Sequence, residues 1–108
     1  MSDPEMTART LERAARLIDE LGWCQGEQTE PDGGICAATA LMRAAQIEAS
    51  EYGDVLDIYE LSRMALGFST GDVTVGLFCL ASWNDQPGRT RQEVVDRLRG
   101  AARELMVK

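Results

Sequence analysis

The feature of this sequence that most restricts its fold is residues 83–93, Trp-Asn-Asp-Gln-Pro-Gly-Arg-Thr-Arg-Gln-Glu. An apolar run ends at Trp83, and Asn84 is the non-glycine residue type that best tolerates the left-handed conformation in which many helices end. Residues 86–89 then place proline at the second turn position and glycine at the third, as a type II turn requires. The stretch therefore predicts the end of one helix followed by a reversal of the chain.

The same stretch predicts the start of the last helix. Thr90 and Glu93 form a capping box, in which the threonine hydroxyl accepts from the Glu93 N–H and the Glu93 carboxylate accepts from the Thr90 N–H. The helix is expected from Arg91 to about Val107, and Gly100 within it costs about 1 kcal/mol relative to alanine unless a neighbour packs closely there. Its inward residues are expected to be Val94, Val95, Leu98, Ala101, Ala102 and Leu105.

Apolar residues at helical spacing predict further helices upstream, over residues 4–21 ended by Gly22, over residues 37–49, and from Asp54 to Gly67. The run at 73–83 fits a strand or a buried helix, and its length without polar alternation favours the helix. The expected inward residues of these helices are Leu11, Ala14, Ala15, Ile18 and Leu21; Leu41 and Ala45 with Ala38, Met42 and Ile47; and Val55, Ile58, Leu61, Met64 and Ala65.

The helical period disappears over residues 23–36, where Pro31-Asp32-Gly33-Gly34 is a concentrated turn signal. We expect a short hairpin or an ordered loop here, with Trp23 packed on the helices and its indole N–H bonded to a partner. A length of 108 residues, 44% of them apolar and 27% charged, indicates a single globular domain spanning residues 1–108. The predicted fold is mainly α, a compact bundle of four to five helices.

Three motifs connect this chain to other proteins: residues 21–26 (Leu-Gly-Trp-Cys-Gln-Gly), residues 34–36 (Gly-Ile-Cys) and residues 83–90 (Trp-Asn-Asp-Gln-Pro-Gly-Arg-Thr). Together they resemble a family of small proteins of unknown function from actinobacteria and their phages. That family usually carries a second glycine and a leucine shortly after the second cysteine, where this chain has Ala-Ala-Thr-Ala-Leu at residues 37–41. The resemblance implies a source and a fold, and it brings no mechanism with it.

The composition excludes several kinds of enzyme. The sequence contains no histidine, so a Ser-His or Cys-His nucleophile pair cannot form within this chain. The three cysteines, Cys24, Cys36 and Cys79, are an odd number without paired spacing and fit a reducing compartment. Cys24 and Cys36 could form a redox pair or bind a metal, but buried core thiols are the simpler interpretation. We therefore expect no metal and no cofactor.

The charge distribution separates the last helix from the rest of the chain. The net charge of −7 disfavours binding of a nucleic acid by the whole surface. Residues 1–88 hold 5 basic and 15 acidic side chains, whereas residues 89–108 hold 6 basic and 3 acidic ones. The last helix could contact phosphates or dock on the acidic surface of a second copy to give a homodimer, while a Glu93–Arg97 pair is typical of a solvated helix. The arginines concerned are Arg89, Arg91, Arg97, Arg99 and Arg103.

Two other groups of polar residues are candidates for function. Trp83, Asn84, Asp85 and Arg89 could form a binding site that combines a carboxylate, a guanidinium and an amide beside an aromatic ring. The structural alternative is that Asn84 ends a helix and that Asp85 pairs with Arg89 across the turn. The second group recurs at every third position and is either a solvated face or a surface for a basic partner; it consists of Glu48, Glu51, Asp54, Asp57 and Glu60.

The favoured function is non-catalytic. We expect a small actinobacterial or phage protein that binds a host or cellular protein, modulating it during infection if phage-encoded. The acidic N-terminus and the lack of a long apolar run predict a cytoplasmic protein without a membrane segment, in the host cytoplasm if phage-encoded. The alternatives are a small ligand-binding domain or enzyme that uses Trp83, Asp85 and Arg89, and nucleic-acid binding through the last helix.

Overall fold

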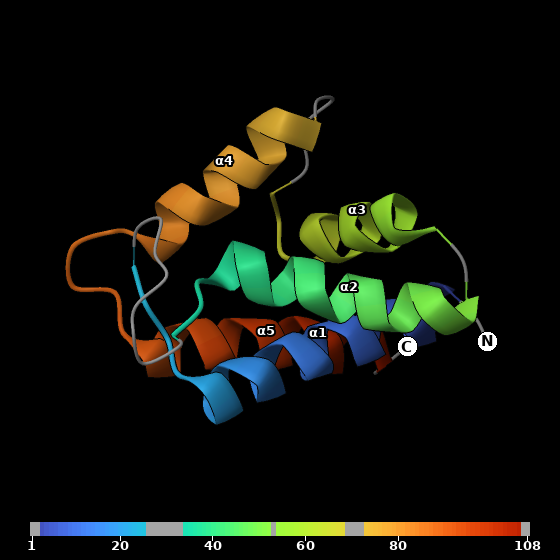
Figure 1. The fold of residues 1–108 in the computed structure, drawn as a ribbon, viewed down its shortest axis with the longest axis horizontal. Helices are drawn as coiled ribbons and strands as arrows, with labels where there is room; N and C mark the ends of the chain where they lie inside the picture. The colour runs from blue at the N-terminus through green and yellow to red at the C-terminus, as the bar shows by residue number, and fades with distance from the viewer. Residues whose placement is uncertain (1–2, 26–33, 53, 69–72, 107–108) are drawn as a thin grey trace.

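The computed structural model describes residues 3–25, 34–52, 54–68 and 73–106, without the side chains of residues 3, 51, 52 and 73–78 (Figure 1). Within these ranges it has five helices: α1 (Asp3–Leu21), α2 (Ala37–Tyr52), α3 (Val55–Ala65), α4 (Val73–Asn84) and α5 (Arg91–Met106). α1 packs against α5 and α2, while α3 and α4 cover α2 (Figure 1). The principal extents are 36 × 29 × 25 Å. The predicted mainly α bundle is confirmed.

α1 is built as the spacing of its apolar residues predicts. Leu11, Ala14 and Ile18 are fully buried. Gly22 has φ 92° and its N–H donates to the Ile18 carbonyl at 2.9 Å, which closes the helix in the left-handed conformation that suits glycine. Leu21, at the last position of the helix, was expected inside but is 40% exposed.

α2 is three residues longer than predicted and buries an alanine-rich face. Ala40, Leu41, Ala44 and Ala45 are fully buried, and the small side chains of the three alanines let α1 and α2 lie close together. The same face ends in Glu48, which is 1% exposed, whereas Ile47 is 43% exposed and not inward as predicted. Position 48 follows Leu41 by seven residues, two helical turns, so helical geometry points its carboxylate inward.

α3 begins and ends with specific hydrogen bonds. Asp54 is the N-cap, and its side chain accepts from the Leu56 N–H at 2.8 Å. At the other end Gly67, with φ 92°, donates to the Met64 carbonyl, and Phe68 donates to Arg63, the pair of bonds that defines a Schellman motif. Both ends agree with the predicted helix from Asp54 to Gly67.

The buried face of α3 differs from the predicted one. It consists of Ile58, Tyr59, Ser62 and Arg63, whereas Met64 is 48% exposed. The apolar residues of this segment are spread around the helix, so apolar spacing alone did not identify which face packs on α2. A polar residue, Arg63, takes one of the inward positions and is buried completely.

Residues 73–84 form a helix, which confirms the helical interpretation of this run over the strand. Two expectations lie outside the described residues, the turn at residues 31–33 and the helix end at Val107. No helix in the described part of the chain is both long enough and apolar enough to cross a membrane.

The described flanks of the segment between α1 and α2 pair in parallel, which contradicts the hairpin and not the ordered loop of the prediction. Trp23 and Ile35 form an isolated parallel bridge, in which the Ile35 N–H donates to the Gly22 carbonyl and the Cys24 N–H donates to the Ile35 carbonyl. A hairpin would pair its flanks antiparallel. A Cβ on Gly34 would lie 3.2 Å from the Trp23 carbonyl oxygen, so glycine permits this close approach.

Candidate functional site

Asn84 lies at the centre of the predicted loop site, and its side chain is completely buried. Its Oδ1 accepts from the Trp23 indole N–H at 2.7 Å and from the Ala37 backbone N–H at 3.0 Å. Its Nδ2 donates to the Cys24 carbonyl at 3.1 Å and to Asp85 Oδ1 at 3.0 Å. Since Ala37 is the first residue of α2, Asn84 caps that helix from a distant part of the chain. The bond that Trp23 was expected to make is confirmed.

The predicted left-handed conformation of Asn84 is wrong. None of the described residues other than glycine has a positive φ. α4 continues through Asn84, and the N–H of the next residue, Asp85, still donates to the Ala81 carbonyl at 3.0 Å. The side chain of Asn84 is held in the interior by its four hydrogen bonds, and the first positive φ after α4 is at Gly88.

The turn and the capping box that follow agree with the sequence. The Arg89 N–H donates to the Gln86 carbonyl at 3.0 Å, and Gly88 has φ 85°, as a type II turn requires at that position. The Thr90 N–H donates to Glu93 Oε1 at 2.9 Å, and the Glu93 N–H donates to the Thr90 hydroxyl at 3.2 Å. Both features of the stretch are therefore confirmed.

Arg89 covers the indole ring of Trp83. Its guanidinium carbon lies 4.1 Å from the ring centroid, and its Nε donates to the Trp83 carbonyl at 2.9 Å. The expected Asp85–Arg89 pair is not among the ion pairs of the described residues, because Arg89 reaches Glu93 at 3.4 Å instead. Asp85 is exposed and Asn84 is buried, so the structure does not bring the four predicted residues together around a common space.

Arg97 of α5 contacts the aromatic rings of both Phe68 and Trp83. Its guanidinium carbon lies 5.6 Å from the ring centroids of both Phe68 and Trp83, and its Nη2 donates to the Leu66 carbonyl at 2.6 Å. The predicted Glu93–Arg97 pair is wrong, since Glu93 pairs with Arg89. Arg97 therefore connects α5 to the Leu66 carbonyl at the end of α3, and it contacts the rings of Phe68 and Trp83.

The arginines at the start and middle of α5 bind acidic residues of α1. Arg91 lies 3.2 Å from Asp19, and Arg99 lies 2.9 Å from Asp19 and 3.8 Å from Glu12. Burial on its own would raise the pKa of Asp19, but the hydrogen bonds from Arg91 and Arg99 outweigh it and lower the pKa below its ordinary value of 3.8. Much of the basic charge of the last helix is therefore engaged within the same chain.

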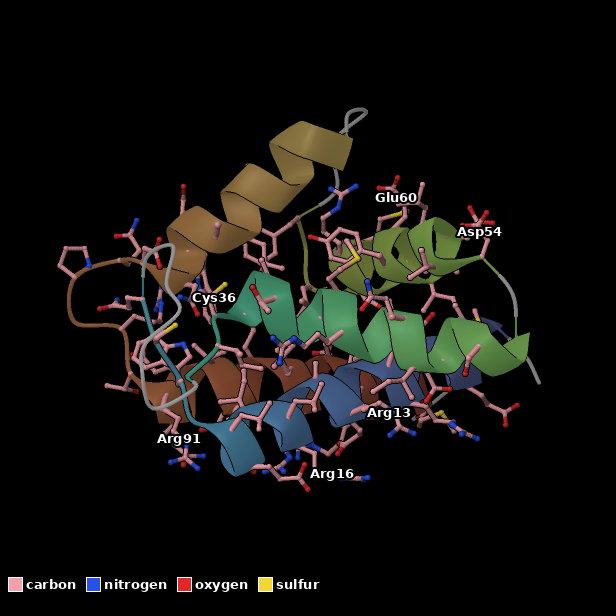
Figure 2. All side chains as sticks on the ribbon, viewed as in Figure 1. Arg13, Arg16, Cys36, Asp54, Glu60 and Arg91 are labelled. Carbon is pink, nitrogen blue, oxygen red and sulfur yellow. The ribbon has the colours of Figure 1, made fainter. Side chains whose placement is uncertain are left out.

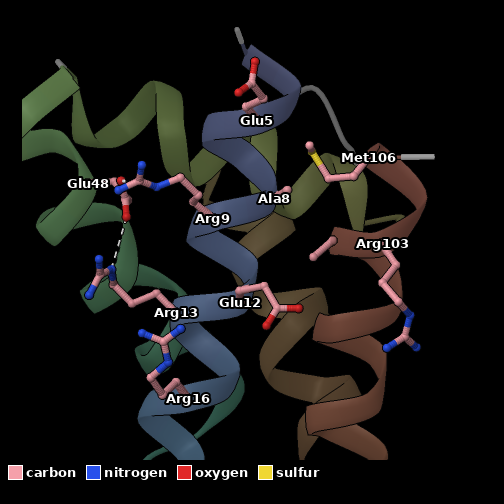
Figure 3. Close-up of a pocket in the computed structure, with 10 residues that line it drawn as sticks. Glu5, Ala8, Arg9, Glu12, Arg13, Arg16, Glu48, Arg103 and Met106 are labelled. Atoms are coloured by element: carbon pink, nitrogen blue, oxygen red, sulfur yellow. Dashed lines mark hydrogen bonds and ion pairs between the residues drawn. The ribbon is translucent and has the colours of Figure 1, made fainter. Parts of the chain in front are cut away.

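A groove of about 530 Å³ runs along α1, between α2 and α5 (Figure 3). Figure 2 shows Arg13 and Arg16 on the outer side of α1. Sequence analysis did not single out this surface, because its residues come from three helices and form no contiguous motif. The lining residues are Glu5, Ala8, Arg9, Glu12, Arg13, Arg16, Glu48, Ala102, Arg103 and Met106.

Glu48 is the buried anion of this groove. Arg13 donates from Nε to Glu48 Oε1 at 3.1 Å, and the Nε of Arg9 lies 3.7 Å from Oε2. Arg16 and Arg103 make no hydrogen bond or ion pair with any residue that the structure describes. Since Glu48 belongs to the regularly spaced acidic residues, the expectation of one solvated acidic face is wrong at this position.

Tyr59 and Arg63 are both completely buried on α3, next to the buried Ser62. Arg63 pairs with Glu60 and donates to the Phe68 carbonyl. Burial raises the pKa of Tyr59 to about 12, although the nearby Arg63 charge opposes the shift. The Tyr59 hydroxyl has no hydrogen-bond partner among the described residues. Tyr59 and Arg63 are four residues apart, which places them on the same face of a helix. Nothing else in the sequence indicates that they are buried together.

The three cysteines differ in burial and in their hydrogen bonds. Cys24 is buried, and its thiol donates to the Gly34 carbonyl at 3.4 Å. Cys36 precedes α2, and its sulfur accepts from the Thr39 N–H at 3.5 Å. Cys79 is exposed, and all three are free thiols. Among the described residues no three Cys, Asp or Glu side chains converge in a way that could hold a metal ion.

The described residues form a mainly α fold, in which the buried Asn84 at the end of α4 caps the distant helix α2. The model of a family of unknown function (DUF6197) matches residues 2–104, and this chain belongs to that family. The comparison with curated proteins found no match, and the comparison with solved structures found none either. What the protein can do must therefore be inferred from the geometry of its own residues.

Proposed function

We propose that this chain is a non-catalytic protein of an actinobacterium or its phage that acts in the cytoplasm by binding a host or cellular protein. The observation that carries the proposal is the groove along α1, where Arg16 and Arg103 are without partners among the described residues. Unpartnered arginines beside exposed apolar surface are typical of protein-binding surfaces, and Met106 at this groove is 56% exposed. The three sequence motifs support the proposed source.

The two alternative functions have less support. A ligand site at residues 83–89 would need the polar groups that Asn84 and Arg89 already use in bonds within the protein. Nucleic-acid binding through the last helix would need Arg91 and Arg99, which are paired with acidic residues of α1. The same pairs reduce the positive charge that α5 could offer to a second copy in a homodimer.

Affinity capture from an actinobacterial lysate tests the proposal. The tagged protein would be compared with a variant carrying Arg16→Ala and Arg103→Ala, and with the control Arg43→Ala. Arg43 is an exposed arginine of α2 that does not line the groove. We expect one protein to be retained by the native form and the control and lost by the groove variant. Equal capture by all three proteins, or an equal loss with the control Arg43→Ala, would contradict a role for the groove.

A further inference from the structure

We propose that the partner offers the groove an acidic helix, whose carboxylates bind a row of three arginines on α1, Arg9, Arg13 and Arg16. This inference rests on the proposed function and specifies the chemistry of the partner. The arginines are four and three residues apart, so they lie on one face of α1 with axial separations of about 6 and 4.5 Å. Figure 3 shows the three side chains on the same side of the helix, with Glu48 next to Arg9 and Arg13.

Glu48 holds Arg13 and Arg9 of this row in place for the binding of an anion. Its buried carboxylate accepts from the Nε of Arg13 and lies near the Nε of Arg9. No hydrogen bond of the described residues occupies the two terminal nitrogens of Arg13, which leaves its outer edge to bind a carboxylate. A guanidinium held by one edge loses less conformational freedom when it binds with the other. Arg16 extends the row with a side chain that is entirely unpartnered within the described structure.

The spacing of the row identifies a helix as the occupant. A helix with acidic residues at i, i+3 and i+7 repeats the same axial separations on one face, and when it lies antiparallel to α1 each carboxylate meets one arginine. An extended acidic strand would place neighbouring same-face residues about 7 Å apart and would match the shorter interval poorly. A long polyanion is disfavoured by the protein's net charge of −7 and by Glu5 and Glu12 in the same groove.

Synthetic peptides test this directly. The probe is an alanine-based helical peptide with glutamates at i, i+3 and i+7, and the reference peptide has the same composition with the glutamates on different faces. Binding would be titrated by fluorescence anisotropy at low and at physiological ionic strength. We expect the probe to bind more tightly than the reference, Arg16→Ala to weaken it about five- to tenfold, and Arg43→Ala to leave it unchanged. Circular dichroism confirms that both variants are folded.

Four outcomes would overturn the inference. Equal binding of the two peptides would mean that charge alone is recognised, and equal effects of Arg16→Ala and Arg43→Ala would place binding outside the groove. Tighter binding of a DNA duplex, sensitive to Arg16, would make the groove a nucleic-acid site. If no peptide binds while the lysate experiment still finds a groove-dependent partner, the acidic helix is wrong and the proposed function stands.

Discussion

Replacement of Asn84 by alanine should be the most damaging single change in the region that joins α4 to α2. The substitution leaves the Trp23 indole N–H and the Ala37 N–H without their acceptor, and the Cys24 carbonyl without its donor. A buried group that loses its partner costs about 1 to 3 kcal/mol, and loss of a helix cap costs about 1 kcal/mol. Because the indole is only partly buried and water can reach it, we expect a total of about 3 to 4 kcal/mol.

The free energy of unfolding can be measured by urea denaturation followed by far-ultraviolet circular dichroism. The matched control is Gln46→Ala, which removes a side-chain amide from an exposed position of α2 and should change stability by less than about 0.5 kcal/mol. The double variant Asn84→Ala, Trp23→Phe should lose less than the sum of the two single variants, since both remove the same bond. A loss below about 1 kcal/mol for Asn84→Ala, or full additivity, would refute the reasoning.

Further predictions concern two glycines and two titrating groups. Gly67→Ala should cost about 1 to 2 kcal/mol, because φ 92° is strained for alanine. Gly100→Ala should instead stabilise by about 0.5 to 1 kcal/mol, because no atom lies within 4 Å of its added Cβ. The absorbance of tyrosinate should show Tyr59 ionising near pH 12, with stability present below pH 10 and lost as the pH rises through 12. Asp19→Asn should cost up to about 1 kcal/mol at neutral pH, a difference that disappears as the pH falls through the lowered native pKa of Asp19, below 3.8.

Each of these predictions can be contradicted by a specific result. Equal effects of the two glycine substitutions would mean that backbone conformation does not govern them. Tyr59→Phe should remove the alkaline transition near pH 12. A stability difference for Asp19→Asn that is unchanged in high salt, or at pH 2, would exclude an electrostatic origin.

Local signals in the sequence predicted much of the fold. Helix ends at Gly22, Asp54 and Gly67, the turn at Gly88 and the Thr90 capping box all appear in the structure. Each depends on backbone conformation or hydrogen bonds within a few residues, so the responsible atoms are neighbours in the chain. The same holds for the predicted helices at residues 4–21, 37–49 and 54–67, whose existence follows from apolar spacing.

What the sequence alone determined, therefore, is the mainly α character, the order of the helices and the position of most of their ends. Only the tertiary structure decided that Asn84 caps α2, that the segment after α1 pairs in parallel and that Glu48 is buried among arginines of α1. In each case the interacting atoms are separated by at least ten residues, and their meeting depends on how whole helices pack. Helical periodicity shows which residues share a face, but the packing of the helices decides which polar residue on that face finds a partner.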